Sequence, residues 1–266
     1  MKGKVLFFLS CALLLHACTE YGKAVKETDP VKKLASAKQY YEDGEYYKAL
    51  PMFEELVGLT RGKQEAEEVY YYFAKTNYGL KDYYSANYYF KAYAKSFKGS
   101  KRSEECLFMA AMSSYQLSPN YSLDQLDSQV AIDEFQYFLD QYPTSSLRDS
   151  ANKLVEILNF KVEKKDFEVA SLYVKTEKYK AATYALQEFI KAYPQSKFKE
   201  EAMYLIIKSK YLLADGSVDS KKLDRFRETI ESYITFVSAF PKSKYLNELD
   251  KFNEKSLNWV EQLSKQ

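Results

Sequence analysis

Side chains that commonly carry out catalysis are scarce in this chain. Its only histidine is His16, and its three cysteines are Cys11, Cys18 and Cys106. The sequence contains no glycine-rich phosphate loop, no Cys/His pattern with metal-ligand spacing and no nucleophile elbow. Carboxylates are common, but solvated helix faces account for them. We therefore predict that the protein is not an enzyme and has no catalytic residue, no metal site and no cofactor.

The N-terminus predicts one covalent modification. A basic start is followed by an apolar run of 11 residues from Val5 to Leu15. At about 1.5 Å per residue this run is too short to cross a bilayer, and it is typical of a secretory signal. It ends in Leu15-His16-Ala17-Cys18, which resembles the lipobox of lipoproteins. We predict that residues 1–17 are removed and that Cys18 is acylated, for example with palmitate. An ordinary signal peptide with a chance cysteine, or a cytosolic apolar start, are the alternatives.

Residues 18–30 are polar and lack helical periodicity, so we expect a lipid-anchored tether. Only Glu20 is acidic in its first five residues, which favours the periplasmic side over the cell surface. Removal of the signal takes away His16 and Cys11 and leaves Cys106 without a disulfide partner. We expect Cys106 to be a buried, inert thiol. Without Lys2 and Lys4, 37 basic and 37 acidic residues remain, so nucleic acid is not an expected partner.

One sequence block recurs along the chain and predicts where helices end. It reads Phe138-Leu-Asp-Gln-Tyr142-Pro143-Thr-Ser145, and it recurs at Phe189–Ser196 and Phe236–Ser243, with a copy lacking proline at Tyr93–Ser100. Its two aromatics lie on one helix face, and the proline moves the residue before it out of the α region. The serine is placed to cap the following helix.

A second repetition, at an offset of 37 residues, predicts helical pairs. The matched positions are Ala37 with Ala74, Tyr46 and Tyr47 with Tyr83 and Tyr84, Ala49 with Ala86, and Phe53 with Phe90. These are the intervals of a tetratricopeptide repeat, in which small and aromatic residues alternate where two helices touch. Asp43-Gly44 is expected to form the turn of the first pair, with glycine at positive φ.

The same register predicts three further pairs and a cap. No proline or glycine occurs from Thr144 to Tyr193, so we expect one long helix over about Ser146 to Thr176. The last apolar stretch, which contains Trp259, predicts a helix that caps the last repeat. The predicted fold is an all-α solenoid of about five tetratricopeptide-like pairs. We divide it into repeats 1–3 (residues 31–143) and repeats 4–5 with the cap (144–266).

A peptide-binding groove is the candidate functional site. Thirteen of the 26 tyrosines lie between Tyr40 and Tyr93, and the first helix of each tetratricopeptide pair lines the concave surface. A groove lined by tyrosine rings and lysine ammonium groups suits extended peptides that end in an aromatic residue and a carboxylate. Packing of the tyrosines between helices, with solvated lysines, is the alternative. The residues expected in the groove are Lys38, Tyr41, Tyr71, Lys75 and Tyr78.

The lipobox cysteine, the short tether and the five uneven repeats together resemble the BamD family of outer membrane protein assembly factors. Ala37-x6-Gly44-x4-Ala49, the Tyr-Pro-x-Ser blocks and the extended fourth-repeat helix carry the resemblance. It implies a non-catalytic scaffold of the β-barrel assembly machinery, held by Cys18 at the periplasmic face of the outer membrane. Implied partners are the barrel-forming subunit with periplasmic repeats, mainly at the C-terminal repeats, and unfolded outer membrane proteins. Two alternatives remain open: another periplasmic repeat lipoprotein that coordinates envelope processes, and a glycan-binding lipoprotein.

Overall fold

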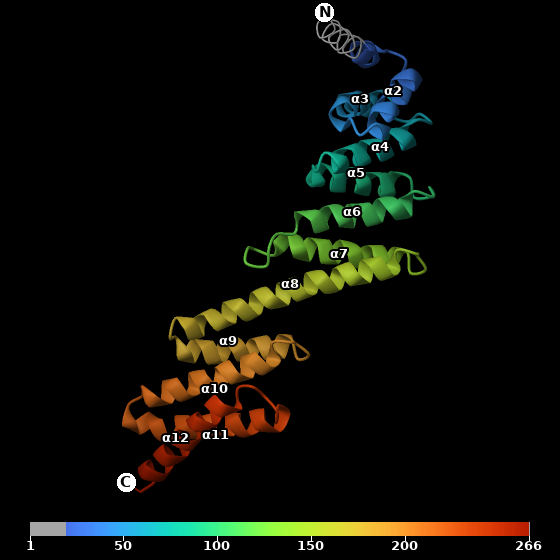
Figure 1. Cartoon of the computed structure of the whole chain (residues 1–266). Coiled ribbons are helices and arrows are strands. Elements are labelled where there is room, and N and C mark those ends of the chain that lie inside the picture. Colours follow the sequence, from blue (N-terminus) through green and yellow to red (C-terminus); the bar gives the residue numbers. More distant parts are fainter. Residues whose placement is uncertain (1–19, 266) are drawn as a thin grey trace, which may run out of the picture. The chain divides into compact units, whose positions relative to one another are not determined.

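The structure is a computed structural model that describes residues 20–265, and within these residues every regular element is a helix (Figure 1). Cys18 and the predicted signal peptide lie outside the described residues. A short helix covers 20–26. The helices that follow are α2 (Pro30–Glu42), α3 (Tyr46–Leu59), α4 (Ala66–Gly79), α5 (Tyr83–Ser96), α6 (Ser103–Leu117), α7 (Leu126–Gln141), α8 (Arg148–Lys175), α9 (Tyr179–Ala192), α10 (Lys199–Asp215), α11 (Asp219–Ala239) and α12 (Leu246–Leu263).

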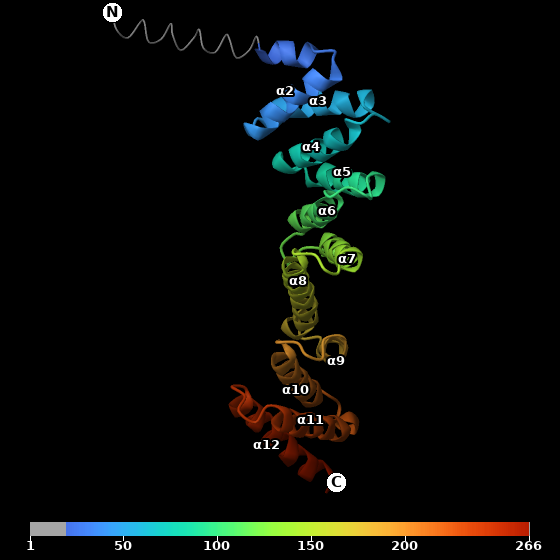
Figure 2. The same ribbon diagram turned by 90° about the vertical axis from the view of Figure 1, so that its right-hand side faces the viewer.

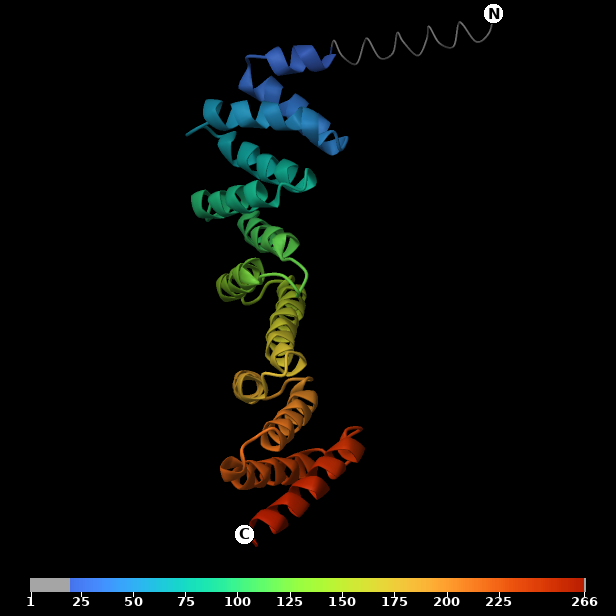
Figure 3. The same cartoon turned by 90° about the vertical axis from the view of Figure 1, so that its left-hand side faces the viewer.

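These helices form the predicted pairs: α2/α3, α4/α5, α6/α7, α8/α9 and α10/α11, with α12 as the cap. In the stretch from α2 to α7, and again from α9 to α12, each helix packs against the next one in the chain, as the three views of the ribbon show (Figures 1, 2 and 3). The all-α, tetratricopeptide-like solenoid class is therefore confirmed. The long helix predicted at Ser146–Thr176 is α8, which has 28 residues.

The chain divides into two compact units, one ending at Leu158 and the other beginning at Asn159. This division falls inside α8, 15 residues after the boundary expected at Pro143. The division falls there because α8 is long, and each half of it contributes buried residues to a different unit. Its first half buries Ala151 and Leu158, while its second half buries Phe167 and Ala170. We call the part up to Leu158 unit 1 and the rest unit 2.

Part of the expected tether is folded. Residues 20–26 are helical, and Tyr21, Ala24 and Val25 pack against the core formed by α2 and α3. The ring of Tyr21 lies edge-on to that of Tyr40, with centroids 5.6 Å apart. These three apolar side chains lie on one face of the short helix and are enough to hold it against the neighbouring core. They are too few to give a helical periodicity that can be recognised in the sequence.

The recurrent aromatic-Pro-x-Ser block ends helices as expected. Helices α7, α9 and α11 stop two residues before Pro143, Pro194 and Pro241. The residue before each proline has left the α region, with φ between −126° and −134° and ψ between 66° and 68°. The backbone therefore turns at the same place in three repeats because the proline forbids the α conformation there.

The serine of this block has a second role that the sequence did not reveal. Ser145 Oγ accepts a hydrogen bond from the Leu147 backbone N–H at 3.0 Å and donates one to Glu104 at 2.5 Å. Ser196 does the same with the Phe198 N–H (2.9 Å) and Glu163 (2.5 Å). Each serine thus ties the start of one first helix to the preceding first helix.

Among the described residues, three of the turns that join the two helices of a pair place a residue at positive φ, and only one of these three uses glycine. Gly44, Lys81 and Glu177 have φ of 74°, 63° and 59°. They occupy the same turn position in repeats 1, 2 and 4, between the two helices of a pair. An L-residue with a side chain is strained in this conformation by about 1–2 kcal/mol, whereas glycine is not.

Lys81→Gly and Glu177→Gly are therefore expected to stabilise the protein by about 0.5–1 kcal/mol each, after the added chain entropy of glycine is subtracted. Urea unfolding followed by circular dichroism measures the change. Asp43→Gly is the matched control, because Asp43 has an ordinary φ of −74° in the first of these turns. Equal effects of all three substitutions would contradict the strain argument.

Candidate functional site

The predicted groove residues lie on the first helices of repeats 1 and 2. Lys38 and Tyr41 are on α2, and Tyr71, Lys75 and Tyr78 are on α4. Lys75 Nζ lies 5.0 Å from the centroid of the Tyr71 ring and 6.0 Å from that of Tyr41. The rings of Tyr41 and Tyr72 meet edge to face at 5.2 Å, and Lys38 Nζ lies 5.1 Å from the Tyr72 centroid. We call Lys38, Tyr41, Tyr71, Tyr72 and Lys75 the first-helix cluster.

Tyr78 is separate from this cluster. Its ring contacts the rings of Tyr83 and Phe90, with centroids 5.3 Å and 6.5 Å away. Tyr71 is 7% exposed, so its ring packs between helices. The structure therefore brings four of the five predicted residues together, and it buries much of the aromatic surface that was expected to form the walls.

Two glutamates pair with the lysines of the cluster. Lys38 Nζ lies 2.6 Å from Glu68 Oε1, and Lys75 Nζ lies 3.7 Å from Glu105 Oε1. The Tyr71 hydroxyl donates to both oxygens of Glu105 at 2.9 and 3.0 Å and accepts from Lys75 at 3.2 Å. Each pair joins the first helix of one repeat to the first helix of the next. Sequence reasoning missed the glutamates, although Glu68 and Glu105 show the same 37-residue offset as Lys38 and Lys75.

The electrostatics of the cluster keep its lysines charged and keep Tyr41 and Tyr71 neutral. The hydrogen bond to Glu68 raises the pKa of Lys38. Burial alone lowers the pKa of Lys75, but the bond to Tyr71 and the charge of Glu105 outweigh it and the net pKa is raised. Burial beside Tyr46 and Tyr72 raises the pKa of Tyr41 to about 12. The cluster can therefore exchange hydrogen bonds with a peptide, and a ligand carboxylate has to compete with the two glutamates.

The same arrangement recurs in unit 2. Tyr204 and Lys208 on α10 have the spacing of Tyr71 and Lys75, and Glu248 on α12 takes the place of Glu105. The Tyr204 hydroxyl donates to Glu248 at 2.8 Å, and Lys208 donates to Tyr204 and to Glu248 at 3.2 Å each. A Tyr-x3-Lys pair on the first helix of a repeat thus faces a glutamate of the next first helix in unit 1 and a glutamate of the capping helix in unit 2.

Buried tyrosines predict a loss of stability at alkaline pH. Burial is the main cause that raises the pKa of Tyr41, Tyr71, Tyr93, Tyr193 and Tyr204. These pKa values are higher in the folded than in the unfolded protein. The contribution of these tyrosines to the stability of the folded state is therefore complete below about pH 10, the ordinary tyrosine pKa. It is lost as the pH rises through the folded values. We expect helicity and tyrosinate absorbance to change together above pH 10, and Tyr41→Phe to shift this transition to higher pH. Complete tyrosine ionisation with helicity intact would contradict it.

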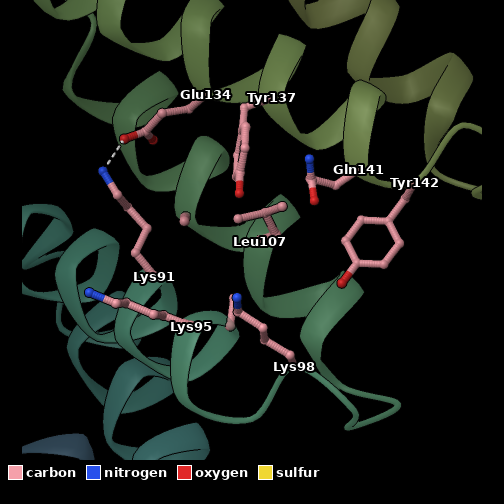
Figure 4. Close-up of a pocket in the computed structure, with 10 residues that line it drawn as sticks. Lys91, Lys95, Lys98, Leu107, Glu134, Tyr137, Gln141 and Tyr142 are labelled. Carbon is pink, nitrogen blue, oxygen red and sulfur yellow. Dashed lines mark hydrogen bonds and ion pairs between the residues drawn. The ribbon is translucent and has the colours of Figure 1, made fainter.

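A pocket of about 660 Å³ lies on another part of unit 1, between α5, α6 and α7 (Figure 4). It lies among three lysines from α5 and the loop after it, an apolar floor from α5 and α6, and polar and aromatic side chains from α7. The lining residues are Lys91, Ala94, Lys95, Lys98, Leu107, Ala110, Glu134, Tyr137, Gln141 and Tyr142. The sequence did not predict this pocket, although Lys91, Lys95 and Lys98 have the spacing of one helix face.

Among the described residues, no group of three or more histidine, cysteine or carboxylate side chains is placed to hold a metal ion. In the same part of the chain, no helix combines the length and the apolar character needed to cross a membrane. Cys106 is buried, and burial raises the pKa of its thiol well above the usual range, so it is held in its protonated, unreactive form.

Comparison with known proteins identifies the family. A search of curated proteins finds no match to this chain. The family described as YfiO, outer membrane lipoprotein, matches residues 27–184 and 175–253. These two segments overlap and together extend from the end of the predicted tether, through all five helical pairs, into α12. With most of its length matched, the chain belongs to the YfiO family of outer membrane lipoproteins.

Proposed function

We propose that this protein is a non-catalytic scaffold of the outer membrane β-barrel assembly machinery, of the BamD kind. It binds the barrel-forming subunit through that subunit's periplasmic repeats, and it receives unfolded outer membrane proteins as substrates. Acylated Cys18 holds it at the periplasmic face of the outer membrane. The family match over residues 27–253 is the observation that carries this proposal.

The structure supports a binding role in two ways. Stacked helical pairs present side chains from successive first helices on one surface, which suits an extended chain better than a small molecule. In unit 1 this surface carries the first-helix cluster, where lysine and tyrosine side chains from two repeats lie within about 6 Å of one another. We assign the unfolded substrate to this cluster and the barrel-forming subunit to the C-terminal repeats.

Affinity purification from detergent-solubilised membranes tests the proposal. The full-length protein carries a C-terminal tag, and cross-linking in intact cells precedes solubilisation. Recovery of a β-barrel protein that bears periplasmic repeats is the expected result. If a TonB-dependent porin or a cell-wall hydrolase is recovered in its place, the protein serves glycan uptake or envelope coordination and the assembly role is rejected.

The groove lysines give a prediction of their own. Lys38→Glu combined with Lys75→Glu is expected to weaken the binding of a labelled peptide from the last strand of a barrel protein by about tenfold, because two attractive contacts become repulsive. Fluorescence anisotropy measures the affinity. Lys38→Gln with Lys75→Gln removes the charges without repelling Glu68 and Glu105, and should have a smaller effect in the same direction.

Lys32→Glu combined with Lys63→Glu is the matched control, since both side chains are exposed and lie outside the cluster. Circular dichroism establishes that each variant is folded. Unchanged affinity in the Lys38/Lys75 variants, or an equal loss in the control, would remove the groove from the proposal.

A further inference from the structure

The pocket between α5, α6 and α7 has a charge that its own side chains do not balance. Glu134, its only carboxylate, accepts hydrogen bonds from Lys91 (2.8 Å), Asn87 (2.7 Å) and Ser114 (2.8 Å). This glutamate is therefore satisfied within the protein, and it neutralises Lys91. The ammonium groups of Lys95 and Lys98 have no hydrogen-bond or ion-pair partner among the described residues. Two positive charges remain for a ligand.

A comparison between repeats shows why the pocket also has a free hydroxyl. In unit 2, Tyr193 donates a hydrogen bond to Asp166 at 2.6 Å. Tyr142 holds the same position in the repeated block of unit 1, and the residue that matches Asp166 there is Leu107. The leucine cannot accept a hydrogen bond, so the Tyr142 hydroxyl has no partner among the described residues and lies in the pocket lining. The substitution of leucine for an acid thus opens an apolar floor and frees a polar group at its edge.

The lining combines this apolar floor with groups that form hydrogen bonds. Leu107, Ala94 and Ala110 form the floor. Figure 4 shows Tyr137 entering from α7 and Lys98 from the opposite side, both directed toward Leu107. Gln141 and Tyr142 lie at one end. A volume of about 660 Å³ is in the usual range for a site that holds a small molecule or a short segment of chain.

These features favour a peptide over a lipid. An acyl chain on the floor would cover the hydroxyls of Tyr137 and Tyr142 and the amide of Gln141 without giving them a hydrogen bond, which is unfavourable. A peptide backbone offers N–H and C=O groups at the spacing such side chains need. Acidic side chains match the two free ammonium groups, and an apolar side chain fills the space above Leu107.

We propose that this pocket is a second peptide-binding site, and that it takes a short acidic segment of a partner protein containing a large apolar residue. The site lies mainly on the second helices of repeats 2 and 3, and it shares no residue with the first-helix cluster. It therefore goes beyond the assembly role proposed above and does not depend on it.

Fluorescence anisotropy with the full mature chain tests the site. The probe is a labelled peptide, Glu-Phe-Glu-Leu-Glu, and the matched probes replace glutamate by lysine or the apolar residues by serine. Lys95→Glu with Lys98→Glu is expected to weaken binding of the acidic probe by about tenfold or more. Ala94→Trp, which fills the pocket, should have a similar effect. The controls are Lys101→Glu with Lys199→Glu and Ala192→Trp, whose replaced residues lie outside the pocket.

The outcomes are distinct. Selective binding of the acidic, apolar probe that is lost in the Lys95/Lys98 variant and kept in the controls supports the site. Equal loss in the charge controls means that only net charge is being measured and overturns it, as does equal binding of the serine-substituted probe. If vesicles containing phosphatidylglycerol bind in the same variant-dependent way while the peptide does not, the occupant is a lipid and the peptide proposal is wrong.

Discussion

Replacement of Phe90 by alanine is expected to destabilise unit 1 by about 3–5 kcal/mol. The Phe90 side chain is fully buried, and it belongs to the core that α4, α5 and α6 share. Tyr71, Ala86, Tyr93 and Cys106 surround it in this core. A small side chain here leaves a cavity that the surrounding helices cannot close, because α5 is held by neighbours on both sides. The loss therefore exceeds the transfer free energy of the removed atoms.

Urea unfolding followed by circular dichroism measures this loss. Tyr88→Ala is the control on the same helix, since Tyr88 is 66% exposed, and its effect should stay within about 0.5 kcal/mol. Because the chain has two units, the curve is fitted with one transition for each unit. A loss below about 1 kcal/mol for Phe90→Ala would show that this position is not in a packed core and would contradict the helical pairing described here.

The repeated pattern in the sequence was sufficient to predict the fold. Local rules decide where these helices start and stop: prolines at 143, 194 and 241 forbid continuation, and glycine at 44 accepts the turn. The register of alanine and phenylalanine then determines which faces meet, so Ala49 with Phe53 and Ala86 with Phe90 are all buried. Each of these is a short-range property, and its recurrence from repeat to repeat can be seen in the sequence alone.

Contacts between repeats were harder to foresee. The glutamates that pair with Lys38 and Lys75 lie 30 residues further along the chain in each case, on another helix. Nothing in the local sequence separates Glu68 and Glu105 from the many solvated carboxylates. The pocket is harder still, since its lining comes from three helices and depends on Leu107 standing where the equivalent repeat has Asp166. Only the comparison of two repeats in space makes that difference visible.

The lipid anchor gives the second large effect. Cys18→Ser is expected to remove the protein from the outer membrane fraction, because serine has no thiol to carry the thioether-linked lipid that we propose as the anchor. Each buried CH₂ of an acyl chain contributes about 0.8 kcal/mol, so several chains hold a protein in the membrane essentially permanently. A protein without acyl chains is held only by its contacts with partner proteins. Fractionation of membranes by density, with mass spectrometry of the N-terminal peptide, measures both the location and the modification.

Cys106→Ser is the matched control for this experiment. Its thiol is buried and protonated, so its replacement should leave acylation and fractionation unchanged. An acylated N-terminal peptide in Cys106→Ser and an unmodified precursor in Cys18→Ser are the expected pair of results. Retention of Cys18→Ser in the outer membrane, resistant to high salt, would show that protein contacts rather than acyl chains hold the molecule there.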